Sequence, residues 1–74
     1  MILLMQYKIL IVDDEPMLTE LLADYLNDMG YLPYTATDSI QAMEKLKVSP
    51  DLILLDINMP GMDGLDFCKT IRDE

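Results

Sequence analysis

The sequence predicts an α/β fold in which three strands alternate with three helices, in the order βαβαβα. Two short apolar runs, 8–12 and 52–55, have the length of strands, and between them lies a longer segment with apolar residues at helical spacing. Alternation of strands with helices requires a parallel sheet with right-handed crossovers. At 74 residues the chain has room for one small domain, residues 1–74, whose core supplies only about 3–5 kcal/mol of net stability.

The first strand and helix are the clearest elements. Residues 8–12 form a continuous apolar run, typical of a strand buried on both faces. Asp13-Asp14-Glu15-Pro16 then resembles a helix start, with acids near the positive end of the dipole and proline in the first turn. The helix should reach about residue 29, before Gly30. One broad apolar stripe follows it: Met17, Leu18, Leu21, Leu22, Tyr25, Leu26 and Met29.

The second strand is expected over 31–35, where Pro33 confines it to a sheet edge. Asp38-Ser39 then caps a short second helix, and Ser49-Pro50-Asp51 forms the turn that ends it. The apolar residues expected to share one face of this helix are Ile40, Met43 and Leu46.

The third strand is expected over 52–55, followed by a sharply turning loop over 58–64. A third helix should start near Gly64, with Leu65, Cys68 and Ile71 on one side. Because Pro33 places the second strand outside, the first strand lies between the other two, in the spatial order 2-1-3. Ligands of open α/β sheets bind at the topological switch point, where the order of the strands reverses. Here that point lies beyond the carboxyl ends of the first and third strands.

Composition excludes several classes of function. The hydrophobic fraction of 51% and charged fraction of 26% are those of a folded globular protein. A net charge of −9, with five basic residues and no histidine, argues against direct binding of nucleic acid or an anionic membrane. The single Cys68 excludes an internal disulfide and the usual zinc clusters, so a cytoplasmic location is expected. Residues 1–6 are apolar but too short to cross a bilayer, and are interpreted as an N-terminal leader.

Acidic residues follow both predicted central strands. Asp13 and Asp14 follow the first strand and Asp56 follows the third. Three carboxylates a few ångströms apart repel by roughly 4 kcal/mol per pair at an effective dielectric near 20, so they need a cation or a shared proton. Mg²⁺, which prefers oxygen ligands, is the expected cation. Taken singly, the first acids could instead cap the helix, Asp56 could be a solvated strand end, and Asp63-Gly64 is a common turn pair.

Two motifs together resemble the receiver domain of bacterial two-component response regulators: residues 8–16, KILIVDDEP, and residues 51–64, DLILLDINMPGMDG. The resemblance implies a flavodoxin-like, doubly wound parallel sheet. It implies that Asp56 is the phosphoacceptor for a sensor histidine kinase, and that the chain is a signalling module rather than an enzyme. It also implies Mg²⁺ bound by Asp13, Asp14, Asp56 and the main-chain carbonyl of Asn58. Pro60 and Gly64 match loop-shaping positions of the family.

The resemblance covers three of the family's five βα units, so the chain is expected to be a truncated receiver. The family's switch hydroxyl and phosphate-pairing lysine have no counterpart here, since Lys45 and Lys69 lie on predicted helices, and switching should be impaired. The resemblance also implies a DNA-binding effector domain after the receiver in a full-length parent, and none is expected within residues 1–74. The outer edge of strand 52–55 should be exposed and drive homo-oligomerisation. Two alternatives remain: a structural half-domain that self-assembles, and an aspartyl-phosphate phosphatase, which would need an acid where this chain has Asn58.

Overall fold

The fold is known from a computed structural model that describes residues 7–56. The elements run in the order β1 (Lys8–Val12), α1 (Pro16–Asp28), β2 (Leu32–Ala36), α2 (Ser39–Lys45), the 3-10 turn η1 (Leu46–Val48) and β3 (Leu52–Leu55). Each strand and helix predicted for this part of the chain is present, with boundaries that differ by one residue or less, except that α2 ends at Lys45 and the 3-10 turn η1 continues it to the predicted turn at Ser49. The predicted leader 1–6, the loop 58–64 and the third helix lie outside the described residues, and so do Asn58, Asp63 and Cys68.

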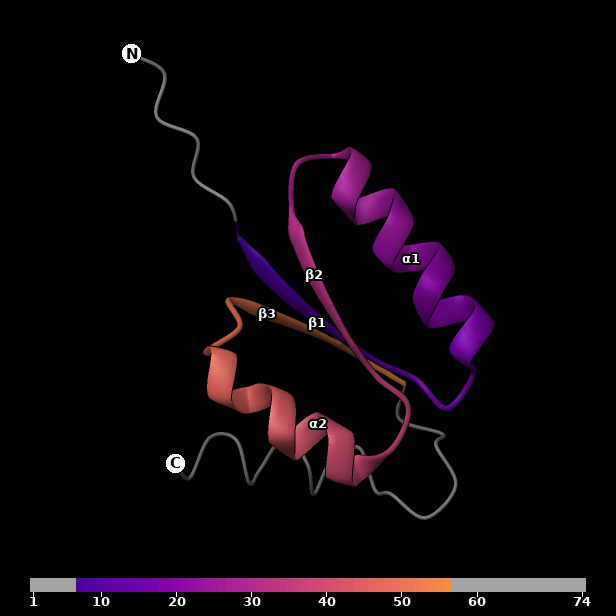
Figure 1. Ribbon diagram of the computed structural model, residues 1–74, viewed down its shortest axis with the longest axis vertical. Helices are drawn as coiled ribbons and strands as arrows, with labels where there is room; N and C mark the ends of the chain where they lie inside the picture. Colours follow the sequence, from indigo (N-terminus) through magenta and orange to yellow (C-terminus); the bar gives the residue numbers. More distant parts are fainter. Residues whose placement is uncertain (1–6, 57–74) are drawn as a thin grey trace.

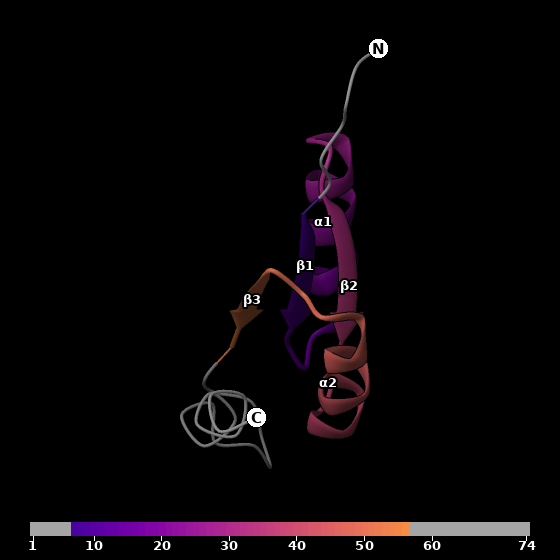
Figure 2. The ribbon, with the colours of Figure 1, turned by 90° about the vertical axis from the view of Figure 1, so that its left-hand side faces the viewer.

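The three strands form one parallel sheet in the order β2-β1-β3, which confirms the predicted topology. Figure 2 shows β1 lying between the other two strands. Pro33 belongs to the edge strand β2, as expected of a residue that has no amide hydrogen to donate. In the β1–β3 ladder Ile9 pairs with Leu52 and Val12 with Leu55, so the two strands end level with each other.

Alternate residues of the strands point to opposite faces of the sheet, and one helix packs on each face (Figure 1). The α2 face holds the core cluster of Leu10, Val12, Ala36 and Ala42, with partly buried Tyr34, Leu46, Ile53 and Leu55 around it. On the α1 face, Ile9 and Ile11 of β1 are 4% and 1% exposed, while their β3 partners Leu52 and Leu54 are 52% and 38% exposed. Helix α1 therefore covers β1 but not β3.

The buried side of α1 is narrower than the predicted stripe. Leu22 and Leu26 are partly buried, and Thr19 is the one buried residue of the helix. The remaining apolar residues of the stripe are exposed: Met17, Leu18, Leu21, Tyr25 and Met29. The reason is the width of the sheet, because α1 lies over β1 and β2 and the described strands offer no surface to the far side of the helix.

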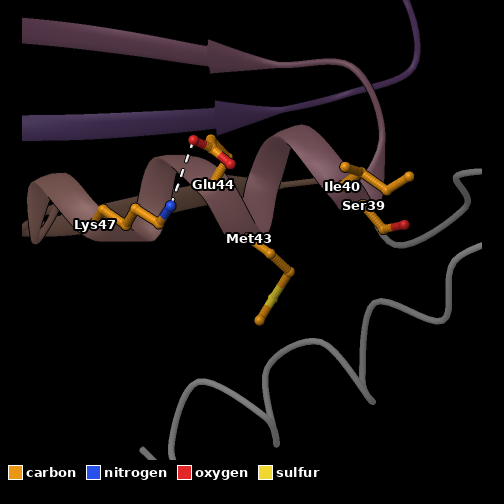
Figure 3. A pocket seen from close by; sticks show the side chains of 5 residues that line it. All are labelled: Ser39, Ile40, Met43, Glu44 and Lys47. Atoms are coloured by element: carbon orange, nitrogen blue, oxygen red, sulfur yellow. Dashed lines mark hydrogen bonds and ion pairs between the residues drawn. The ribbon is translucent and has the colours of Figure 1, made fainter.

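Helix α2 corrects a second expectation. Ile40 is 79% exposed and Met43 is 38% exposed, whereas Ala42 is fully buried and Leu46 packs against the core. Figure 3 shows Met43 pointing away from the strands and Lys47 paired with Glu44 at 3.5 Å on the surface. The buried face therefore runs through Ala42 of α2 and Leu46 at the start of η1, four residues apart and so on the same side of the helix.

Asp38 caps α2, as predicted, and accepts a hydrogen bond from the Gln41 amide at 2.7 Å. Replacing Asp38 by alanine should lower the free energy of unfolding by about 1 kcal/mol, since the first turn loses the partner of one of its amides. Urea denaturation would measure the change. Glu44→Ala is the matched control, because its ion pair is exposed and should contribute almost nothing. Equal losses in the two variants would contradict the capping role.

Lys8 fixes the position of β3 against β1. Its backbone amide donates to the Asp51 carboxylate at 2.8 Å, its Nζ donates to the Val48 carbonyl at 2.9 Å, and its carbonyl accepts from the Asp51 amide at 2.8 Å. These three bonds tie the end of η1 and the start of β3 to the first residue of β1. They set the register that brings the carboxyl ends of β1 and β3 together.

No helix in the described part of the chain is long and apolar enough to cross a membrane.

Candidate metal centre

The candidate site lies at the carboxyl ends of β1 and β3, where the parallel register delivers Asp13 and Asp56 side by side. The Asp56 amide donates to the Val12 carbonyl at 2.9 Å, which continues the β1–β3 ladder one residue beyond β3. On the other side of β1, the Asp13 amide donates to the Ala36 carbonyl of β2 at 3.1 Å. Backbone hydrogen bonds thus hold both acids to the sheet. The two acids lie at the topological switch point between β1 and β3, where the order of the strands reverses.

Asp13, Asp14 and Asp56 converge, as the sequence predicted. Each offers one carboxylate oxygen, and these three oxygens lie within 4.8 Å of one another. Asp13 and Asp56 are half-buried while Asp14 is exposed, so water screens the repulsion that Asp14 adds more effectively than the repulsion between the other two. The geometry is that of a carboxylate cluster open to solvent on one side.

The acids after β1 do not cap α1, so that alternative interpretation is wrong. Glu15 occupies the N-cap position, and its side chain makes no capping hydrogen bond. One Asp13 oxygen instead accepts from the Glu15 amide at 3.0 Å and closes the turn that leads into the helix. Pro16 begins the helix as predicted, and buried Thr19 donates its hydroxyl to the Pro16 carbonyl at 2.8 Å. Hydrogen bonds therefore hold the turn at Glu15 and the first turn of the helix at Pro16, and the carboxylates of Asp13 and Asp14 lie close to that of Asp56.

A pocket of about 260 Å³ lies beside the acids on the α1 side of the sheet. Its apolar wall is made by Ile11, Leu22 and Leu54, and Asp13 and Asp56 stand at its polar end. Apolar atoms on one side lower the local dielectric, which strengthens any interaction between the carboxylates and a cation. The sequence pattern predicted Leu22 in the first helix and Leu54 in the third strand. It did not indicate that either residue would lie beside the acids.

The donor set fits a hard divalent cation. Carboxylate oxygens are the ligands that Mg²⁺ takes in proteins, usually one or two of them together with waters and substrate oxygens. Three oxygens within 4.8 Å supply that number with positions left for other ligands. Asn58, whose main-chain carbonyl is predicted to be a further ligand, lies outside the described residues.

The parallel sheet with strand order β2-β1-β3 defines the class of protein as a flavodoxin-like, doubly wound α/β domain. Its three carboxylates lie at the topological switch point, which is where domains of this class bind ligands. Comparison with known proteins gives the family. The model of the response regulator receiver domain matches residues 9–74. The chain belongs to this family, whose members are signalling modules of two-component systems.

Three relatives illustrate the match. The transcriptional regulatory protein BaeR of Escherichia coli is 47% identical over 66 residues, which cover 88% of this chain and 28% of BaeR. The chemotaxis response regulator CheY4 of Vibrio cholerae superposes with a TM-score of 0.84 at 36% identity, covering 92% of this chain and 57% of CheY4. The response regulator TrrA of Thermotoga maritima, solved in complex with Mg²⁺ and beryllium fluoride, gives 0.81 at 42% identity, covering 92% and 60%. The chain thus spans less than two thirds of each.

Proposed function

We propose that this chain is a phosphoacceptor of a two-component signal transduction system, with Asp56 as the residue that receives the phosphoryl group. The observation that carries the proposal is the convergence of Asp13, Asp14 and Asp56 within 4.8 Å in a chain of the receiver family. Among the three acids, Asp56 is the one at the position that resembles the family's phosphoacceptor, and it lines the open pocket together with Asp13.

The reaction is the transfer of a phosphoryl group from a histidine nitrogen to a carboxylate oxygen. A carboxylate oxygen of Asp56 attacks the phosphorus of a phosphohistidine on a sensor histidine kinase, an O–P bond forms, the P–N bond breaks, and the imidazole leaves and takes up a proton. When bound, Mg²⁺ offsets the negative charge that the carboxylates and the phosphoryl oxygens bring together. Asp13 and Asp14 would hold the ion with Asp56 and the Asn58 carbonyl, and the backbone bonds described above hold Asp13 and Asp56 in place before the donor arrives.

Phosphorylation by a small donor tests this function directly. Incubation with an acyl phosphate and Mg²⁺ should add one phosphoryl group per chain, seen by intact mass spectrometry, and the label should fall to background when EDTA replaces Mg²⁺. The adduct should be an acyl phosphate, which hydroxylamine cleaves. Labelling that is independent of the divalent ion would contradict the proposed site.

The phosphatase alternative predicts a different result. An aspartyl-phosphate phosphatase would release product continuously from a chromogenic phosphate ester, whereas a phosphoacceptor should show no turnover. We propose the phosphoacceptor because the residue two positions after Asp56 is Asn58, which offers no carboxyl group to serve as a general acid.

A second proposal concerns assembly. The outer edge of β3 pairs with no other strand among residues 7–56, and Leu52 and Leu54 beside it are exposed. Strand edges of this kind bind other strands, so we propose that the chain forms homo-oligomers through β3. Light scattering should show an apparent mass that rises with concentration, and a monomer throughout the micromolar range would contradict the proposal.

A further inference from the structure

A chain of hydrogen bonds crosses the carboxyl ends of the three described strands. The Asp56 amide donates to the Val12 carbonyl at 2.9 Å. The Asp13 amide, which belongs to the same planar peptide unit as that carbonyl, donates to the Ala36 carbonyl at 3.1 Å. The Ala36 carbonyl in turn shares a planar peptide unit with the Thr37 amide. Two acids of the candidate site are therefore linked, through peptide groups, to the residue that follows β2.

The chain of bonds ends on the side chain of Gln41, in the first turn of α2. Its Oε1 atom accepts from the Thr37 amide at 3.0 Å and from the Thr37 hydroxyl at 3.1 Å, which uses both lone pairs of that oxygen. The Gln41 amide is itself held by the Asp38 carboxylate at 2.7 Å. Figure 1 shows the loop from β2 to α2 at the same end of the sheet as the turn after β1. Helix α2 is thereby tied to the end of the sheet that carries the acids.

The bond from Gln41 differs from ordinary helix capping. Asp38 is the N-cap of α2, so Gln41 is the third helical residue, whose side chain usually reaches back to the N-cap amide. Here the side chain reaches one residue further, to the amide of Thr37. The bond therefore holds the end of the strand as well as the start of the helix.

We propose that Gln41 is a positioning residue for the acidic site. By holding the peptide unit at the end of β2, it fixes the backbone of Asp13 and, one link further, that of Asp56. This inference rests on the proposed function and extends it to a residue outside the carboxylate cluster. A single carbon joins each carboxylate to its backbone, so a displaced peptide unit displaces the ligand oxygens. Mg²⁺ demands nearly ideal octahedral geometry, so such a displacement weakens its binding.

The surroundings of the chain of bonds favour transmission along it. Val12 and Ala36 are both 0% exposed, so the middle of the chain is shielded from water. In such surroundings hydrogen bonds polarise one another, and a bond lost at one end weakens the next. Gln41 is exposed, so water can replace its oxygen at the Thr37 amide, but water has no fixed position there. Loss of the Gln41 acceptor should therefore loosen the site by degrees while the fold persists.

Gln41→Met tests this role, because methionine has a similar length and helix propensity but is only a weak acceptor. Without Mg²⁺, NMR spectra should show changes in amide chemical shift that decrease in the order Thr37, Asp13, Asp56. The dissociation constant of Mg²⁺ should rise about threefold, less than the tenfold or more that follows loss of a direct partner of a metal ligand. The control is Ile40→Met, a neutral change at the neighbouring exposed residue, which should alter neither quantity.

Gln41→Glu should restore both quantities, because a carboxylate oxygen accepts the same two bonds. Ile40→Glu, which adds the same charge to an adjacent exposed position, is the reference for this variant. Failure of the glutamate to restore them would show that the acceptor oxygen is not the cause. Chemical shifts are read from the folded chain alone, so a change in stability does not imitate either result.

Two further outcomes separate this inference from the proposed function. A change at Thr37 that does not reach Asp13, or an unchanged Mg²⁺ affinity in Gln41→Met, would overturn the positioning role and leave the phosphoacceptor function intact. An unmodified chain that binds no Mg²⁺ would overturn both, because the site that Gln41 is proposed to position would not exist.

Discussion

Replacing Asp56 by asparagine is expected to abolish both phosphorylation and the Mg²⁺-dependent binding of beryllium fluoride, while the chain stays folded. The amide has nearly the same shape as the carboxylate but lacks the anionic oxygen that attacks phosphorus or coordinates beryllium. The backbone bond that holds residue 56 to Val12 uses the main-chain amide and survives the change. Labelling by an acyl phosphate should fall to the level measured with EDTA.

The matched control is Asp24→Asn. Asp24 is an exposed acid on α1, so this variant makes the same chemical change and the same change in net charge away from the site. It should be labelled as well as the unmodified chain. Undiminished labelling of Asp56→Asn would move the phosphoacceptor to another residue, and equal loss in both variants would mean that overall charge, and not Asp56, controls the reaction.

Magnesium should raise the thermal stability of the chain by several degrees. A ligand that binds only the folded state at ten times its dissociation constant stabilises it by about 1.4 kcal/mol. For a domain of this size that corresponds to a rise in Tm of roughly 5–10 °C. The three carboxylates converge only when β1 and β3 are paired, so the unfolded chain offers no equivalent site. A thermal melt followed by circular dichroism over a series of MgCl₂ concentrations measures the shift.

Variants of the other two acids separate metal binding from a general salt effect. Asp13→Asn and Asp14→Asn should reduce the Mg²⁺-induced shift. Without Mg²⁺, Asp14→Asn should leave Tm unchanged or raise it, because one charge of the repelling cluster is gone. Asp13→Asn keeps an oxygen that accepts from the Glu15 amide, so its fold should also persist. An identical shift with NaCl at equal ionic strength, or an undiminished shift in both variants, would exclude a specific site.

The elements of the fold follow from short-range patterns. Apolar runs of strand length, the 3.6-residue period of α1, the Asp38 cap and the proline at the start of α1 each act over a few residues, so they can be recognised without knowledge of the tertiary structure. Pro33 also made the strand order predictable. Because proline has no amide hydrogen to donate, its strand lies at the edge of the sheet, and this leaves the first strand between the other two. That strand order predicts that Asp13, Asp14 and Asp56 meet at one edge of the sheet, as the structure shows.

Burial was predicted less well, and the reason is physical. The apolar stripe of α1 and the row Ile40, Met43 and Leu46 are visible in the sequence, yet period alone does not say how wide the opposing surface is. The three described strands leave much of α1 without a surface to cover, and on α2 the residue buried in the core is Ala42. The capping interpretation of the acids before α1 failed for a related reason, since the Asp13 carboxylate reaches the nearer Glu15 amide first.

From sequence alone, the class of fold, the strand order and the identity of the converging acids were accessible, because each depends on local stereochemistry or on charges that stand next to strand ends. Only the tertiary structure determined the register of β1 against β3, in which both strands end at the same height. This register depends on the hydrogen bonds of Lys8 with Val48 and Asp51, some forty residues away in the sequence. It also decided that, within residues 7–56, α1 covers β1 and leaves Leu52 and Leu54 of β3 exposed. Such features arise from contacts between distant segments, for which one sequence carries no local signal.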